Sequence, residues 1–171
     1  AHMIALAEMI MVAKLPVNLS LWIAAVDNSI SANAFLPGDV CRARNGLSVE
    51  IGHTDAEGRL ILADLIAAAC ENNPQCIIDY ATLTGAQRVA LGMDLPAVFA
   101  NCPDTASSLV QIGQELNDPL WPLPLFAPYK TQIESEIADL SSTGKTPYGG
   151  AITAALFLQN FPRFARLLNF Y

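Results

Sequence analysis

Charged residues are scarce in this sequence. They make up 15% of its 171 residues, whereas hydrophobic residues make up 53%, an apolar excess that predicts buried interfaces between subunits. Long uninterrupted apolar runs are also absent, so we expect no membrane-spanning helix, which needs about 18 or more apolar residues. The formal net charge of −7 repels phosphate groups. Nucleic acid is therefore not the expected partner.

The four cysteines lack the CxxC spacing that is typical of zinc and redox sites. Their neighbours are mostly apolar, as in the three alanines before Cys70 and the two isoleucines after Cys76. We interpret Cys41, Cys70, Cys76 and Cys102 as reduced core residues, which is typical of a cytoplasmic protein. A metal site or a disulfide is the alternative, and a titration that found fewer than four free thiols would favour it.

The order of apolar patterns predicts one α/β domain over residues 1–171, with no linker that divides it. Helices are expected at 1–13 and 60–69, both buried, at 105–116, which is amphipathic, and at 151–160. Parallel strands buried on both faces are expected at 17–26 and 76–81, with a short strand at 97–100. Segments 40–44 and 47–51 around Asn45-Gly46 predict a hairpin. The prolines at 119, 122, 124 and 128 predict an extended loop.

The segment Thr54-Asp55-Ala56-Glu57-Gly58-Arg59 concentrates charge in this weakly charged chain. One interpretation is a capping box, in which Thr54 accepts from the first helical turn and Glu57 reaches back. In an extended or irregular turn, the alternative, Asp55, Glu57 and Arg59 would share one side. Two carboxylates held together suit a divalent cation, and an adjacent arginine suits an anion or developing negative charge. The residues alone leave both interpretations open.

Residues 53–60, HTDAEGRL, resemble the NTDAEGRL motif of the leucyl aminopeptidase family of two-metal peptidases. Other elements of that family have similar counterparts in the same order, from Ala1 to about Phe161. They are Val26-Asp27-Asn28, Asn33-Ala34, Pro37-Gly38-Asp39-Val40, Asp79-Tyr80-Ala81-Thr82-Leu83-Thr84-Gly85-Ala86, Trp121-Pro122-Leu123-Pro124, Ser135 with Ile137-Ala138-Asp139-Leu140, and residues 149–158.

The resemblance implies a three-layer αβα sandwich around a mixed, mostly parallel sheet, as the C-terminal part of an aminopeptidase catalytic domain. It implies that Asp55 and Glu57 bind two divalent metal ions, manganese or zinc, with Glu57 bridging them, and that Arg59 is the catalytic arginine. Thr82, Leu83, Thr84 and Gly85 would hold the peptide substrate, although a plain strand-to-helix turn is the alternative. The turn at 149–151 would border the side-chain pocket or simply begin a helix. Family members are cytoplasmic hexamers.

The sequence also departs from the family. Motifs resembling KGxxFDSGG and KxDMGG, which supply further metal ligands and a catalytic lysine, are not found around Lys14, Lys130 or Lys145. We therefore expect a catalytic domain that is incomplete at its N-terminal side, and an inactive structural subunit is the alternative function. His53 replaces the family's asparagine, and we expect it to substitute a hydrogen bond. His2 is expected to be a packed or exposed residue, and residues 164–168 diverge from a WAHLD-like run.

Overall fold

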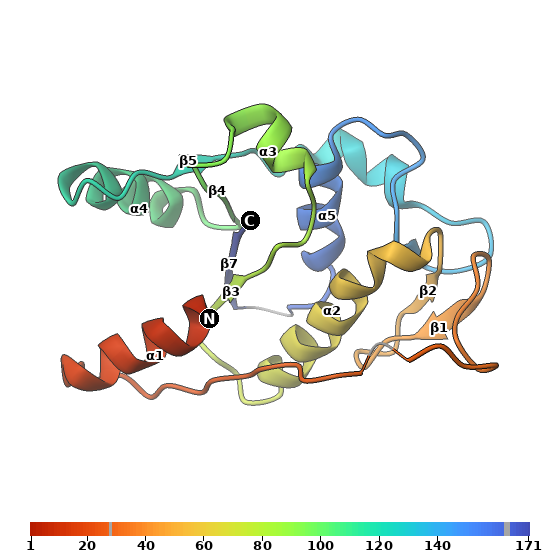
Figure 1. Ribbon diagram of the computed structural model, residues 1–171, viewed down its shortest axis with the longest axis horizontal. Coiled ribbons are helices and arrows are strands. Elements are labelled where there is room, and N and C mark those ends of the chain that lie inside the picture. Colours follow the sequence, from red (N-terminus) through yellow and green to blue (C-terminus); the bar gives the residue numbers. More distant parts are fainter. Residues whose placement is uncertain (28, 163–164) are drawn as a thin grey trace.

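The structure is a computed structural model that describes residues 1–27, 29–162 and 165–171. Asn28 of the VDN element and Phe164 of the divergent C-terminal run lie outside the described residues. Helices and strands alternate along most of the chain (Figure 1). In chain order the elements are α1 (His2–Val12), β1 (Val40–Arg42), β2 (Ser48–Glu50), η1 (Thr54–Ala56), α2 (Glu57–Cys70), β3 (Cys76–Tyr80), α3 (Ala86–Leu91), β4 (Ala97–Ala100), α4 (Pro103–Glu115), β5 (Trp121–Pro122), η2 (Ala127–Ile133), β6 (Leu140–Ser141), α5 (Gly150–Leu158) and β7 (Arg166–Phe170).

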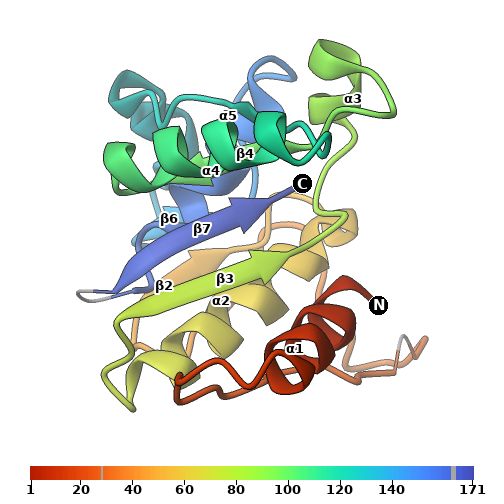
Figure 2. The ribbon, with the colours of Figure 1, turned by 90° about the vertical axis from the view of Figure 1, so that its left-hand side faces the viewer.

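The main sheet has the strand order β3-β7-β4-β5. β3 pairs parallel with β7, and β4 pairs parallel with β5, whereas β4 and β7 are antiparallel. Figures 1 and 2 show α1 and α4 on one face of this sheet and α2 and α5 on the other. A smaller sheet, β1-β2-β6, lies beyond α2. The expected three-layer α/β architecture with a mixed, mostly parallel main sheet is confirmed.

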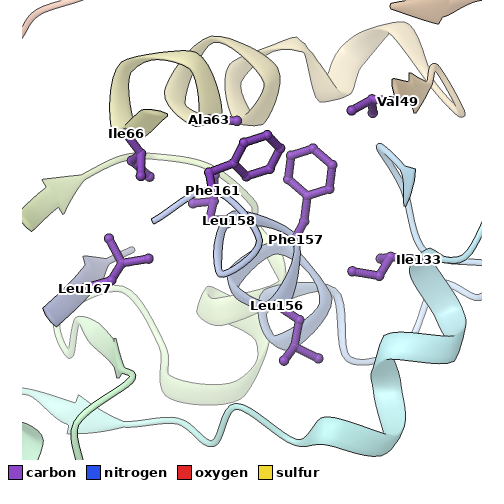
Figure 3. Close-up of a cluster of buried hydrophobic side chains, with 9 residues drawn as sticks. All are labelled: Val49, Ala63, Ile66, Ile133, Leu156, Phe157, Leu158, Phe161 and Leu167. Atoms are coloured by element: carbon purple, nitrogen blue, oxygen red, sulfur yellow. The ribbon is translucent and has the colours of Figure 1, made fainter. Parts of the chain in front are cut away.

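The core lies on both faces of the sheet because successive strand residues point in opposite directions. Leu167 of β7 belongs to the cluster formed with α2 and α5, whereas Leu168 packs with Leu109 of α4. Most of α5 is buried, and Phe157 and Phe161 bring their ring centroids to 5.2 Å beside α2 (Figure 3). This packing fixes α2, and with it the charged segment at its start, against the centre of the domain.

Most of the expected elements are confirmed. The hairpin forms as β1 and β2 with Val40 opposite Glu50, and the strands at 76–81 and 97–100 form as β3 and β4. The helices at 60–69, 105–116 and 151–160 form as α2, α4 and α5. The proline-rich loop contains the short strand β5 and the 3-10 helix η2.

The strand expected at 17–26 is wrong. These residues form no strand, and their large side chains are exposed, Leu19 by 43% and Trp22 by 42%. A strand requires a backbone partner, and no described strand lies beside this segment.

The burial expected for the first helix is also wrong, since Ala7 is its one buried residue. Only one side of α1 rests on the protein, where His2 stacks on Tyr80 with ring centroids 5.8 Å apart. The remainder of the helix has no further layer to cover it.

The cysteines are unpaired, as expected, but they are not core residues. Cys76 is exposed and the other three are half-buried. Within the described residues, no helix combines the length and hydropathy required to cross a membrane.

Candidate active site

The charged segment folds as a short 3-10 helix, η1, that runs directly into α2. The expected capping box is wrong, because the N-cap is His53 and its ring performs the capping. His53 Nδ1 accepts a hydrogen bond from the Asp55 amide at 3.0 Å. His53 thus makes a hydrogen bond within this turn, and that the bond replaces one made by the family's asparagine stays a prediction. The extended form of the alternative is wrong too, whereas its other form, an irregular turn that leads from β2 into α2, is what the structure shows.

The three charged side chains of this segment differ in how far they are buried. Asp55 and Glu57 are exposed, whereas Arg59 is only 9% exposed. Burial lowers the pKa of the Arg59 guanidinium, an effect that the neighbouring Tyr171 hydroxyl opposes. Arg59 Nε has no hydrogen-bond partner among the described residues. The arginine is therefore held in place by packing and keeps an unused donor.

One cleft of about 1130 Å³ brings the expected site residues together. The loop that follows β3 lies against the start of α2, so closely that a Cβ on Gly58 would lie 3.6 Å from Leu83 Cδ1. All seven residues assigned to the site from the sequence line this cleft: Asp55, Glu57, Arg59, Thr82, Leu83, Thr84 and Gly85. The loop that follows β3 and the start of α2 therefore border the same cleft.

The carboxylate pair fits part of a divalent metal site. Carboxylate oxygens suit hard divalent cations such as manganese or magnesium, and both groups are accessible at the start of a helix. Two ions need more ligands than two side chains provide. Among the described residues, no group of three or more histidine, cysteine, aspartate or glutamate side chains converges. Asp55 and Glu57 are therefore suited to form a share of such a site.

The turn at 149–151 does not line the cleft in the described part of the chain. Gly149 has a φ of +66° and caps α5. A Cβ on Gly150 would lie 3.2 Å from Ala86 Cβ and 3.9 Å from Thr84 Oγ1, so glycine lets α5 approach the loop after β3. The turn at 149–151 therefore packs against the loop that follows β3 and does not line the cleft itself.

A buried polar group next to the cleft was not identified from the sequence as part of a site. Asp79 is 5% exposed in β3, and its Oδ2 accepts from Asn169 Nδ2 at 2.8 Å. Burial raises the pKa of Asp79 to about 8, against the opposing effect of Asn169. Burial, together with the Asp79 charge, also raises the pKa of Tyr171 well above its ordinary value. The sequence feature that could have indicated this buried group is Asp79 itself, a charged residue inside the otherwise apolar run of residues 76–81.

Comparison with known proteins defines the class of this α/β domain. Residues 1–167 match the model of the cytosol aminopeptidase family, catalytic domain. The chain therefore belongs to the cytosol aminopeptidase family of peptidases.

Individual relatives agree with this assignment. A probable cytosol aminopeptidase of Syntrophotalea carbinolica is 49% identical over 148 residues, which cover 86% of this chain and 30% of that protein. A peptidase B of Pectobacterium atrosepticum is 45% identical over 144 residues, covering 84% of this chain and 33% of that protein. The chain thus spans about a third of the length of the curated relatives it matches.

Solved structures share the arrangement as well. The cytosol aminopeptidase of Coxiella burnetii superimposes with a TM-score of 0.92 at 49% identity, covering 96% of this chain and 36% of that one. A mutant of tomato leucine aminopeptidase gives a TM-score of 0.81 at 42% identity, covering 86% and 29%.

Proposed function

We propose that this chain contributes part of the active site of a metal-dependent aminopeptidase, which releases N-terminal amino acids from peptides. The observation that carries the proposal is the single cleft that gathers the two exposed carboxylates, the buried arginine and the loop at 82–85. The names of the relatives support the same activity.

Each residue has a distinct task in this proposal. Asp55 and Glu57 would hold two divalent ions, manganese or zinc. When bound, these ions supply an activated water and polarise the scissile carbonyl. Arg59 directs its guanidinium at the oxygen on which negative charge develops, and its burial strengthens that interaction.

The loop after β3 holds the substrate. Thr82, Leu83, Thr84 and Gly85 line the same cleft as the carboxylates. Their backbone groups and hydroxyls hydrogen-bond the peptide backbone, so that the N-terminal residue lies beside Asp55 and Glu57. The support of Gly150 behind Thr84 keeps this loop in place.

A manganese titration tests the assignment of the carboxylates. We expect the chain to bind Mn²⁺ weakly by calorimetry, and Glu57→Gln to reduce the affinity by about tenfold or more, because an amide lacks the ligand charge. Glu115→Gln on α4, far along the chain from the cleft residues, is the matched control and should bind as the original chain does. Equal affinity in Glu57→Gln would contradict the metal-binding role.

A structural subunit without activity is the second candidate function. It is favoured by the missing third ligand among the described residues. In either case the chain would be part of a cytoplasmic homo-oligomer, a hexamer as in the family, and the exposed apolar side chains are compatible with large subunit contacts.

A further inference from the structure

The buried side of α2 changes from apolar to charged toward the candidate active site. Arg59, Ala63 and Ile66 have the spacing of one face of a helix, and all three are buried. Ala63 and Ile66 belong with Leu167 of β7 to the apolar cluster of Figure 3. Because α2 and β3 are joined by a short loop and run in opposite directions, the start of α2 lies beside the end of β3. Arg59 therefore lies where the apolar layer ends.

The main sheet changes from apolar to polar at the same level. Asn169 and Tyr171 follow Leu167 on one face of β7, because alternate residues of a strand point the same way. Asp79 of β3 is the register partner of Asn169, and its Oδ2 accepts from Asn169 Nδ2 at 2.8 Å. The Tyr171 ring packs against Phe99, with ring centroids 5.2 Å apart. This face of the sheet thus ends in a carboxyl, an amide and a hydroxyl.

Three of these side chains carry an enclosed polar atom without a hydrogen bond. Arg59 Nε, Asp79 Oδ1 and the Tyr171 hydroxyl have no partner in the part of the chain that the structure describes. Burial raises the pKa of Tyr171, the Asp79 charge raises it further, and Arg59 opposes both effects. The Tyr171 hydroxyl is therefore within electrostatic reach of both charged groups. Buried polar groups are nearly always hydrogen-bonded, so these three atoms point to a common partner outside the polypeptide.

The mixture of groups identifies the chemistry of that partner. The Arg59 guanidinium repels a cation, and the Asp79 carboxyl oxygen disfavours an anion, whereas a neutral molecule that both donates and accepts suits all three atoms. Water has this property, and an internal water typically makes about three hydrogen bonds to buried polar groups. Arg59 and Asp79 both line the cleft, which gives water a path to the site.

We propose that one internal water molecule bridges Arg59 Nε, the Tyr171 hydroxyl and Asp79 Oδ1, which makes Tyr171 and Asp79 positioning residues for Arg59. The water accepts from Nε–H and from the hydroxyl, and it donates to Oδ1. Because a guanidinium is planar, fixing Nε also fixes the plane of the terminal N–H groups. These groups are left for the developing oxyanion, so the positioning role rests on the proposed function. Tyr171 lies beyond residues 1–167, which match the family model, so the bridge is not part of that match.

Nuclear magnetic resonance of the whole chain, labelled at arginine Nε, provides the test. We expect the Arg59 Hε proton to show a cross peak to a long-lived water in a rotating-frame Overhauser experiment. Tyr171→Phe keeps the ring that packs against Phe99 and removes only the hydroxyl. It should raise the Hε exchange rate about tenfold, because hydrogen bonds to charged groups are strong. Tyr148→Phe, 78% exposed, is the matched control and should leave that rate unchanged.

The Ala63 backbone amide, one turn further along α2, distinguishes a local effect from a loosened helix. Its exchange rate should not change in Tyr171→Phe, and an equal acceleration there overturns the positioning role. Asp79→Leu, which has no acceptor, should also accelerate Hε exchange, whereas Asp79→Asn, which keeps an acceptor oxygen, should not.

Metal binding separates this proposal from the proposed function. Tyr171→Phe should keep the Mn²⁺ affinity of the original chain, and Glu57→Gln should keep the slow Hε exchange of Arg59. The two proposals can therefore fail independently of each other. Absence of the water cross peak overturns the bridge, as does an unchanged Hε exchange rate in Tyr171→Phe.

Discussion

The Asp79 side chain is buried in the main sheet, and only 5% of the residue is exposed. Its pKa is about 8 in the folded protein, chiefly because burial disfavours its charged form. In the unfolded chain the pKa returns to the ordinary value of 3.8. The folded state therefore holds a proton that the unfolded state has lost between these two values. Stability consequently falls as the pH rises from about 4 to about 8.

Replacement of this carboxyl should remove that dependence. A tenfold change in proton affinity is worth about 1.4 kcal/mol, so the loss in the original protein amounts to several kcal/mol. We expect Asp79→Asn to be close to the original protein at pH 4 and clearly more stable at pH 8, as measured by urea unfolding. Asp94→Asn, in an exposed loop, is the control. Parallel stability curves for Asp79→Asn and the original chain would contradict the buried-carboxyl explanation.

Among the elements, the turn before α5 carries the clearest steric restriction. Gly149 has a φ of +66°, and a Cβ there would lie 2.7 Å from Tyr129 Cε2. Gly46 has a φ of +95° with nothing within 4 Å of its missing Cβ. Both positions disfavour a side chain through backbone conformation, but only the first adds a collision.

We expect Gly46→Ala to cost about 1–2 kcal/mol of unfolding free energy, from backbone conformation alone. Gly149→Ala should cost roughly 1–3 kcal/mol more, because the Tyr129 ring must move. Chemical denaturation of both variants measures the difference. Equal costs would show that the Tyr129 ring gives way freely.

Elements with a strong local pattern could be predicted from the sequence, and elements defined by distant partners could not. The apolar runs of α2, α5 and β4 predicted their type and approximate ends. Residues 17–26 have an equally strong strand pattern, but the strand requires a partner that the described chain does not contain. β7 was not predicted, because its local pattern is weak: Arg166 and Asn169 are two of its five residues. It is a strand because it pairs with β3 on one side and β4 on the other.

The candidate site, too, could be predicted in part. The resemblance to a family motif assigned Asp55, Glu57 and the loop at 82–85 to one site, and these residues line one cleft in the structure. One of the two interpretations of the local sequence made Thr54 the cap, yet the His53 ring accepts the bond. Burial of Arg59 depends on packing by segments far away in sequence, which no local pattern encodes.

At the scale of the whole molecule, catalysis should require more chain than is present. With added Mn²⁺, we expect the chain alone to hydrolyse leucine amide at least a hundredfold more slowly than the full-length Syntrophotalea carbinolica relative, about 3 kcal/mol in transition-state stabilisation. The reason is the insufficient number of metal ligands among the described residues. A release assay at matched protein concentration measures both rates. Comparable rates would show that the described residues suffice for catalysis.

The central position of β7 also bears on how the protein is made. β3 and β4 each pair with β7 and not with each other, and every paired residue of β3 lies 90 positions before its partner in β7. At a translation rate of about 5–20 residues per second, roughly 5–20 s separate the emergence of these partners from the ribosome. During that interval the two earlier strands are exposed without their middle neighbour, which makes the nascent chain a natural client for chaperones.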